Sequence, residues 1–312
     1  MTRLAVLCSG QGGQGPGMFD AIADAPQAGP VFARAARALG GQDPRRLVSE
    51  AQDRIHENAV AQILCATVAM AWWAILAPHV GKPLAVAGYS AGELPAWGVA
   101  GVLDVDEVFR LVELRAEAMD RASVADAGLG AVKGLPRKDI DALCQRHGVY
   151  VAIVVGPFHF VLGGMREALA KALGEADAHG ASRCERLPVR VPSHTPLLSA
   201  AASDFAEDLR HAVGAPENMR DVRLVSGLDG SRIRDMESGK SKLAAQIAAT
   251  VEWSRVMDAL RAAGTQTFLE LGPGSALSNM AGEFAPELPS RSTAQFRTIE
   301  GVRMWLQEGT RG

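Results

Sequence analysis

The sequence predicts an α/β fold: a mainly parallel sheet with helices on both faces, into which a small ferredoxin-like subdomain is inserted. Two observations carry this prediction. Short apolar strands alternate with longer helical patterns near both ends of the chain, and the connections between them are short. Between these regions, residues 128–187 change to the order β-α-β-β-α-β, which is the order of a ferredoxin-like unit. We therefore expect a large α/β domain formed by residues 1–124 and 189–312, and a small subdomain over residues 125–188.

The large domain is expected to begin with a strand over residues 3–7 that runs into a glycine-rich loop over 10–17. A helix over 105–122 starts with a capping-box pattern, because Asp104 is followed three residues later by Glu107. The other elements expected in this part are helices over 30–39 and 58–76, a strand over 84–87 and a helical run over 93–100.

The subdomain is expected to contain strands over 129–133, 149–155, 158–163 and 182–187, with helices over 136–147 and 165–179. The large domain then resumes with helices over 196–212, 239–249 and 252–263, and with strands over 221–225 and 267–271. The last of these strands opens into a Gly-Pro-Gly turn at 272–274 and a further helix.

Composition and charge exclude several classes of function. The net charge is −3 with basic and acidic residues interspersed, so the sequence has neither the basic patch of a nucleic-acid-binding protein nor a polybasic membrane segment. The longest apolar stretch, 59–77, is interrupted by Gln62 and Thr67 and lacks charged flanks, so we expect a buried central helix and not a membrane span. The four cysteines are far apart without metal-ligand spacing, so we expect no metal site and a reduced, cytoplasmic compartment.

The pentapeptide Gly88-Tyr89-Ser90-Ala91-Gly92 is the strongest functional signal. It follows an apolar strand pattern and precedes a helical run, which is the context of a nucleophile elbow in an α/β-hydrolase-like core. The glycines on either side of Ser90 let the strand and helix pack closely. The first N–H groups of the new helix are unpaired and can donate to a developing oxyanion.

A serine nucleophile needs a base, and His194 is the best candidate among the seven histidines. It lies between Pro192 and Pro196, just where the subdomain should return to the main sheet, and loops at strand ends are where such folds carry reactive groups. The alternative is that His194 caps the helix that starts at Pro196.

Arg115 lies in an apolar setting in the middle of the helix over 105–122. If its guanidinium points into a cleft, it can bind a carboxylate through two parallel hydrogen bonds. The alternative, favoured by the pattern alone, is a surface arginine paired with Glu113 or Glu117.

The loop over residues 10–15 matches the dinucleotide-binding pattern G-x-G-x-x-G. That pattern requires a second strand ending in an acidic residue about 20 residues later. Residues 30–39 are helical in pattern instead, so a tight loop that presents backbone N–H groups beside the serine fits better than a dinucleotide site.

Taken together, these motifs resemble the malonyl-CoA:acyl-carrier-protein transacylase family over nearly the whole length. The resemblance rests on Gly10-Gln11-Gly12 with Gln14, on the serine pentapeptide followed by Glu93, on Arg115 in Glu113-Leu-Arg-x-x-x-Met119, on Val191-Pro-Ser-His194, on Gln246 and on Glu270-Leu-Gly-Pro-Gly274. An inserted ferredoxin-like subdomain is also a trait of this family.

The resemblance implies a role for each matching residue. Ser90 would be the nucleophile, His194 the general base, and Gln246 the position that orients His194 in place of a triad acid. The backbone N–H groups of Gln11 and Ala91 would form the oxyanion hole. Arg115 would bind the free carboxylate of the malonyl group. Coenzyme A would take part as the thioester substrate malonyl-CoA, with no bound cofactor.

Four features depart from the enzymes of fatty-acid synthesis: Ser9 in place of proline, Tyr89 in place of histidine, and the segments 155–164 and 295–306. They resemble the epsilon subunit, a malonyltransferase, of bacterial malonate decarboxylase. That resemblance implies an acceptor thiol on the phosphoribosyl-dephospho-CoA arm of a small acyl-carrier subunit, and other malonate decarboxylase subunits as possible partners.

Three alternatives remain open. The same chemistry could serve fatty-acid or polyketide synthesis, which differs only in the acceptor. A serine thioesterase would use Ser90 and His194, but it gives no reason for Arg115, and Asp104 and Asp106 are typical of a helix start and not of a triad acid. A non-catalytic carrier-binding subunit would not need both Ser90 and His194. Separately, Arg186 and Arg190 could meet CoA phosphates or an acidic carrier, although solvated surface charges are the simpler interpretation.

Overall fold

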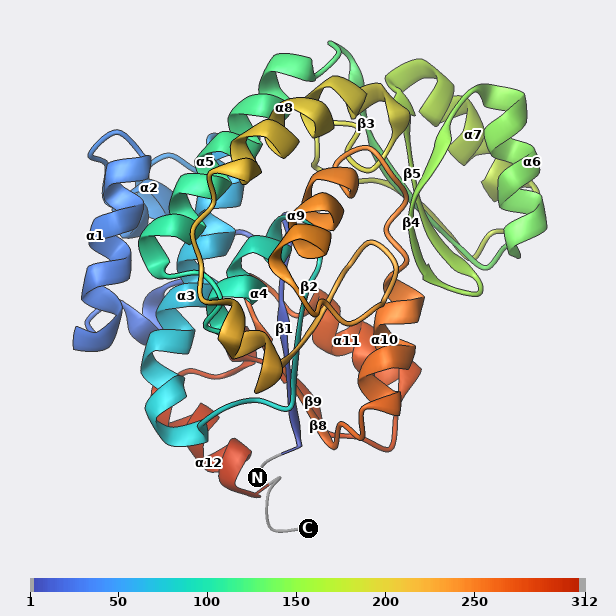
Figure 1. The fold of residues 1–312 in the computed structure, drawn as a ribbon. Coiled ribbons are helices and arrows are strands. Elements are labelled where there is room, and N and C mark those ends of the chain that lie inside the picture. The colour runs from blue at the N-terminus through green and yellow to red at the C-terminus, as the bar shows by residue number, and fades with distance from the viewer. Residues whose placement is uncertain (1–2, 309–312) are drawn as a thin grey trace.

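The computed structural model describes residues 3–308 and contains a parallel sheet flanked by helices, with a second sheet at one side (Figure 1). The parallel sheet has the strand order β7-β2-β1-β8-β9. Its strands are β1 (Leu4–Cys8), β2 (Ala85–Gly88), β7 (Arg223–Val225), β8 (Thr267–Leu271) and β9 (Ser290–Ser292). The predicted α/β class with a parallel sheet is thereby confirmed.

The register of the three central strands brings their carboxyl ends together. Cys8, the last residue of β1, is paired with Gly88 at the end of β2 and with Leu271 at the end of β8. The loops that follow these strands therefore start side by side at one edge of the sheet, which is where parallel α/β sheets place their ligands.

Both faces of this sheet are covered, which explains why its central strands are apolar along their whole length. Alternate residues of β1 contribute to two different cores: Val6 packs with α1, α3, α4 and α5, and Leu7 packs with α10 and α11. The helices of this domain are α1 (Gly29–Ala38), α2 (Pro44–Glu50), α3 (Asn58–Val80), α4 (Glu93–Val99), α5 (Val105–Ala122), α8 (Ser199–Arg210), α9 (Met236–Ala245), α10 (Trp253–Ala262), α11 (Ala276–Phe284) and α12 (Ile299–Glu308).

Helix α3 is long and apolar enough to cross a membrane by length and composition alone, with a mean hydropathy of 1.9. Within the fold, 83% of its most apolar window is buried. It packs against α1, α4 and α5 and against the end of β8. The predicted buried central helix is thus confirmed, and it extends to Val80, two residues beyond a proline at position 78.

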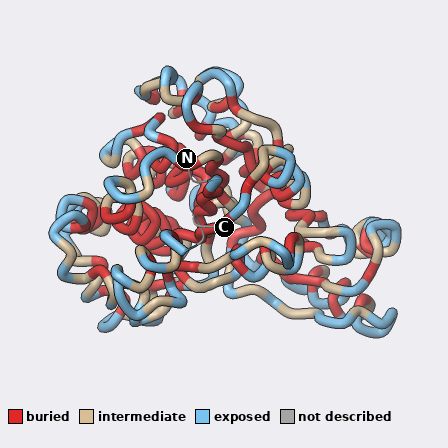
Figure 2. The backbone as a smooth tube through the Cα atoms, turned by 90° about the horizontal axis from the view of Figure 1, so that it is seen from below, coloured by how far each residue is buried: buried red, intermediate tan, exposed pale blue. Residues whose placement is uncertain are grey.

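The second sheet is antiparallel with the order β4-β5-β3-β6, which is the order of a ferredoxin-like unit. Its strands are β3 (Ala127–Lys133), β4 (Tyr150–Gly156), β5 (His159–Met165) and β6 (Arg183–Arg186), and its helices are α6 (Arg137–His147) and α7 (Arg166–Ala178). The two helices cover one face with a core of its own, and the unit projects to one side of the molecule (Figures 1 and 2). The other face turns Leu129, Ile153 and Val161 toward the large domain.

Three described elements were not predicted. The strand β9 has only three residues and no apolar run. Helix α2 is a seven-residue helix that depends on local capping, since Pro44 occupies its first position and the Asp43 carboxylate accepts from the Arg45 N–H at 2.8 Å. Helix α12 begins within the segment 295–306, for which no helix or strand was predicted. Helix α9 starts three residues earlier than expected because Asp235 caps it.

The turn after β2 lies almost against the backbone of β1. A Cβ atom added at Gly92 would lie 2.1 Å from the carbonyl oxygen of Cys8, and one added at Gly88 would lie 2.3 Å from the Cα atom of Glu93. Both neighbours are backbone atoms of the central core, so neither can move aside at small cost. These two glycines are therefore required by the close approach of strand and helix.

We expect Gly92→Ala to destabilise the protein by on the order of 3 kcal/mol or more, because overpacking here displaces main chain and not a flexible side chain. Gly174→Ala is the matched control. Gly174 lies on an exposed face of α7 with open space around its Cα, so alanine there should stabilise by about 0.5–1 kcal/mol. Denaturant unfolding of both variants measures the difference, and equal midpoints for Gly92→Ala and wild type would contradict the packing argument.

Candidate active site

Ser90 lies at the tip of the turn between β2 and α4, as the first residue of a short 3-10 turn (Ser90–Gly92). Its φ is 54°, a left-handed conformation that non-glycine residues rarely adopt. His194, from the loop that returns from the subdomain, has a φ of 63°. Strained residues of this kind cluster at functional sites.

The two strained residues meet. The Oγ atom of Ser90 and the Nε2 atom of His194 are 2.7 Å apart, although the residues are 104 positions apart in the sequence. His194 is buried and its ring contacts the serine, so the alternative that its ring caps the following helix does not hold.

The other side of the imidazole faces the C-terminal end of α9. The carbonyl oxygen of Gln246 lies 2.5 Å from Nδ1 of His194, and the carbonyl oxygen of Ile247 accepts from the His194 backbone N–H at 2.8 Å. The last carbonyl groups of a helix lack intrahelical partners, which leaves them free for this role. Because a carbonyl can only accept, Nδ1 carries the proton and Nε2 can accept from Ser90.

Burial controls the charge of His194. Burial, together with the positive charge of Arg115, lowers the pKa of the imidazole to about 4, although the hydrogen bond to the Gln246 carbonyl opposes both effects. The ring is therefore neutral near pH 7, which is the form that a general base needs.

Arg115 is turned inward from α5 and is 2% exposed. Its Nη1 atom donates to Oε1 of Gln62 at 2.6 Å, whereas its buried Nη2 atom has no partner among residues 3–308. The alternative of a surface ion pair is excluded, since Glu113 pairs with Arg34 at 2.6 Å. Burial lowers the pKa of Arg115 to about 10, so the guanidinium stays charged at neutral pH.

These groups share one small chamber with a volume of about 50 Å³, whose walls include Ser90, His194, Arg115 and Gln11. A larger groove of about 420 Å³ runs between the loops at the sheet edge and strands β3, β5 and β6 of the subdomain. The chamber and the groove share five lining residues: Gln11, Tyr89, Val161, Leu187 and Val189.

The loop after β1 is held in place by its own side chains. Gln14 accepts from the Gly12 N–H at 2.5 Å and donates to the Ile55 carbonyl at 3.1 Å, and the Gln11 side chain donates to Asn58 at 3.0 Å. The loop leads to 3-10 turns and helix α1, with no second strand before the helix, so the dinucleotide interpretation does not hold. Ala91 is the second residue of the serine turn, where N–H groups lack intrahelical partners.

Sequence reasoning assigned no role to three polar residues that support this site. Gln62 and Asn58 connect the guanidinium to the Gln11 loop, since the Gln62 amide also donates to Asn58 at 2.9 Å. The signal for Gln62 was present, because it is a polar residue within the apolar run over 59–77. Glu93 is completely buried beside Gln246, and burial raises its pKa to about 8. An acidic residue placed directly after the serine turn and before an apolar helix was its signal.

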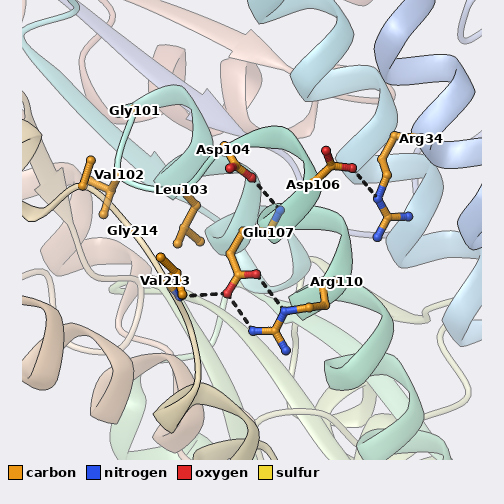
Figure 3. Close-up of a pocket in the computed structure, with 11 residues that line it drawn as sticks. Arg34, Gly101, Val102, Leu103, Asp104, Asp106, Glu107, Arg110, Val213 and Gly214 are labelled. Carbon is orange, nitrogen blue, oxygen red and sulfur yellow. Dashed lines mark hydrogen bonds and ion pairs between the residues drawn. The ribbon is translucent and has the colours of Figure 1, made fainter.

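A second, larger cleft of about 660 Å³ lies at the start of α5 and does not carry this chemistry (Figure 3). Its charged side chains are already paired: Arg34 with Asp106 at 3.2 Å, and Arg110 with Glu107 at 2.6 Å. The candidate site is therefore identified by the reactive side chains that line the same chamber, and not by the size of the cavity.

The basic residues considered near the His194 loop are not part of the groove wall. Arg186 and Arg190 are exposed, whereas Lys133 and Arg183 line the groove. Within the described range 3–308, no group of three or more His, Cys, Asp and Glu side chains is arranged to hold a metal ion.

The chain is similar over most of its length to known proteins. The acyl transferase domain family matches residues 6–286. The malonyl CoA-acyl carrier protein transacylase of Salmonella typhimurium is 31% identical over 291 residues, which cover 90% of this chain and 92% of the relative. The solved structure of the malonyl CoA-acyl carrier protein transacylase from Coxiella burnetii is 26% identical with a TM-score of 0.90, covering 99% of this chain and 98% of that one.

A further solved structure is the malonyl-transacylase PlMCAT in complex with AntF, a type II polyketide acyl-carrier protein in its holo form. It is 26% identical with a TM-score of 0.89, covering 98% of this chain and 100% of that one. The predicted family resemblance is confirmed by these matches. The chain therefore belongs to the acyl transferase domain family, and it is similar over nearly all of its length to malonyl CoA-acyl carrier protein transacylases.

Proposed function

We propose that this protein transfers a malonyl group from malonyl-CoA to the thiol of an acyl-carrier protein through an ester on Ser90. The observation that carries the proposal is the buried guanidinium of Arg115, whose Nη2 atom has no described partner and which lines the same chamber as the Ser90–His194 pair. A buried N–H group of a cation that lacks an acceptor is costly, and a substrate carboxylate would supply that acceptor. A thioesterase for neutral acyl chains has no use for such a group.

The first half-reaction forms the ester. His194 Nε2 takes the proton of the Ser90 hydroxyl as Oγ attacks the thioester carbonyl, and the oxyanion accepts hydrogen bonds from the N–H groups of Gln11 and Ala91. The C–S bond then breaks, and the departing CoA sulfur takes the proton from His194. Malonyl remains on Ser90, with its free carboxylate on Arg115.

The second half-reaction reverses these steps with a different thiol. The carrier thiol gives its proton to His194 and its sulfur attacks the ester carbonyl. When the C–O bond breaks, Ser90 Oγ takes the proton back, so that no net proton is gained or lost by the protein. The Gln246 carbonyl holds the imidazole during both transfers, where a conventional triad would use an acid.

The relatives favour a carrier of fatty-acid or polyketide synthesis as the acceptor, since they are acyl-carrier-protein transacylases and one is solved with a polyketide carrier. The malonate decarboxylase branch is a second candidate. It is supported by Ser9, whose hydroxyl donates to the buried Glu270 carboxylate at 2.6 Å, a contact that proline cannot make. It is also supported by Tyr89, which lies between chamber and groove with its ring 5.1 Å from Trp253. Either acceptor implies a cytoplasmic enzyme.

The ester is directly testable. After incubation with radiolabelled malonyl-CoA, denaturing gels should show label on the wild-type protein and none on Ser90→Ala, because the serine ester survives denaturation. Rapid release of free malonate without labelled protein would contradict the transferase and indicate a hydrolase. Purified carriers that bear either a phosphopantetheine arm or a phosphoribosyl-dephospho-CoA arm should then remove the label from the protein. The carrier that removes the label faster is the acceptor.

Arg115→Ala should change which acyl donor is preferred. Losing hydrogen bonds to a charged group costs about 1.5–3 kcal/mol each, so kcat/KM for malonyl-CoA should fall by roughly 10- to 150-fold while that for acetyl-CoA is unchanged or rises. Arg110→Ala is the matched control on the same helix, because Arg110 pairs with Glu107 away from the chamber. An unchanged malonyl-to-acetyl ratio in Arg115→Ala would rule out the carboxylate clamp.

The acylation rate should depend on pH through His194. Because the neutral ring is the base and its pKa is lowered to about 4, the rate should stay level from neutral pH to about pH 5 and fall only below that. Rapid-quench measurement of ester formation after brief pH jumps, with circular dichroism to check folding, provides the profile. A fall centred near 6.5, the ordinary histidine value, would show that burial does not control this group.

A further inference from the structure

Glu93 occupies a position from which it can act on His194 without touching the substrate. It is the first residue of α4, it is completely buried, and it does not line the chamber. Its carboxyl accepts hydrogen bonds from the Gly227 N–H at 3.2 Å and from the side-chain amide of Gln246. The Ser226 hydroxyl adds a third hydrogen bond.

Gln246 makes contacts in two directions. Its main-chain carbonyl accepts from Nδ1 of His194, whereas its side-chain amide is held by Glu93. Its Oε1 atom is buried with no partner in the described part of the chain, so the contact with Glu93 is the one hydrogen bond found for this side chain. Gln246 lies one residue beyond the last turn of α9, where the backbone is no longer fixed by helical hydrogen bonds on its carbonyl side.

A glycine in the loop after β7 makes room for the Glu93 carboxyl. A Cβ atom at Gly227 would lie 3.0 Å from Oε2 of Glu93 and 3.0 Å from the Gly88 carbonyl, so glycine lets the strand β7 loop approach the carboxyl. The serine turn and the Gln246 segment are thereby joined through one buried side chain. Ser90 lies three residues before Glu93, and His194 lies one hydrogen bond beyond Gln246.

We propose that Glu93 is a positioning residue for acyl transfer: through its hydrogen bond to the Gln246 side chain, it fixes the main-chain carbonyl that orients His194 toward Ser90. This proposal rests on the proposed function of the same site. The hydrogen bond, and not the charge, is the essential part. The Gln246 amide offers both a donor and an acceptor, so either protonation state of the Glu93 carboxyl keeps one hydrogen bond to it.

A purely structural role for Glu93 makes a different prediction. An acidic residue at the start of α4 is favourable for the helix dipole, and its loss would lower stability without changing the reactivity of the folded molecules. The test therefore compares reactivity per folded molecule with stability, and it includes a variant that keeps the hydrogen bond but removes the charge.

The variants are Glu93→Leu, Glu93→Gln and Gln246→Leu, with Val302→Ala as a stability control. Val302 is fully buried in α12, at the end of the molecule opposite the carboxyl ends of the strands (Figure 1). Val302→Ala should lower the melting temperature but leave the reaction rate unchanged. Two rates are measured for each protein: single-turnover malonylation of Ser90, and labelling of Ser90 by a fluorophosphonate, which needs the Ser90–His194 pair but no malonyl-CoA.

We expect Glu93→Leu to slow both rates by about 10- to 100-fold, with the KM for malonyl-CoA within about twofold of wild type. Glu93→Gln should stay within about threefold of wild type, because its amide can still hydrogen-bond Gln246 while accepting from Gly227. Gln246→Leu removes the same contact from the other side and keeps the carbonyl, so it should match Glu93→Leu. The double leucine variant should be no slower than either single one.

Three results would overturn the proposal: wild-type rates in Glu93→Leu, equal losses in Glu93→Gln and Glu93→Leu, or losses that multiply in the double variant. Should Glu93→Leu fail to fold, Gln246→Leu and Glu93→Gln carry the same comparison. A wild-type protein that reacts with the fluorophosphonate but not with malonyl-CoA would contradict the proposed function alone, since the labelling rates still measure the positioning effect.

Discussion

The contact between the turn after β2 and the carboxyl end of β1 is the constraint on which the rest of the site depends. It is a contact between main-chain atoms, with the carbonyl of Cys8 directly beneath Gly92, so it fixes distance more tightly than side-chain packing can. Ser90, with its left-handed conformation, lies in this turn, and the Gln11 loop leaves the same end of β1. The neighbouring pairs of β1 with β2 and β8 hold this arrangement from both sides.

The partner of the imidazole differs in kind from a triad carboxylate. A main-chain carbonyl at a helix terminus cannot ionise, and no side-chain substitution removes it. Its weakness is that it can move with the end of the helix. The described site compensates with contacts around that carbonyl: the Ile247 carbonyl binds the His194 backbone, and Gln246 is held at its side chain. The imidazole is oriented by several ordinary hydrogen bonds, and the carbonyl that accepts from its ring carries no full charge.

Much of the architecture could be predicted from sequence, because its periodic elements are long and its motifs carry backbone requirements. The strands of both sheets other than β9, the order of the subdomain and the buried α3 follow from apolar spacing and glycine positions. Ser90 and His194 could be chosen because few residue types perform their chemistry and each lies in an unusual context, whereas Arg115 could be chosen only through the family resemblance, since its pattern alone favoured a surface ion pair. Short elements such as β9 and α2 could not, since local capping decides them and apolar patterning does not.

The supporting contacts were beyond sequence reasoning for another reason. The acceptor for His194 is a carbonyl that every residue possesses, so only the family resemblance, and not the residue type at position 246, indicated Gln246. Gln62 and Glu93 act across elements that are distant in sequence: Gln62 on α3 meets Arg115 on α5, and Glu93 meets Gln246 across 153 positions. The choice of acceptor is equally hidden, because no residue that lines the chamber or the groove is specific to one carrier arm by its chemistry alone.

The lining residues shared by the chamber and the groove have a kinetic consequence. In the proposed reaction both thiols, that of CoA and that of the carrier arm, reach Ser90 past Gln11, Tyr89 and Val161, because these residues of the two domains line both the chamber and the groove. One arm therefore occupies the space that the other needs. The order of events in catalysis, with departure of the first thiol before arrival of the second, is then imposed by shape as much as by chemistry, and free CoA should act as a competitor of the carrier.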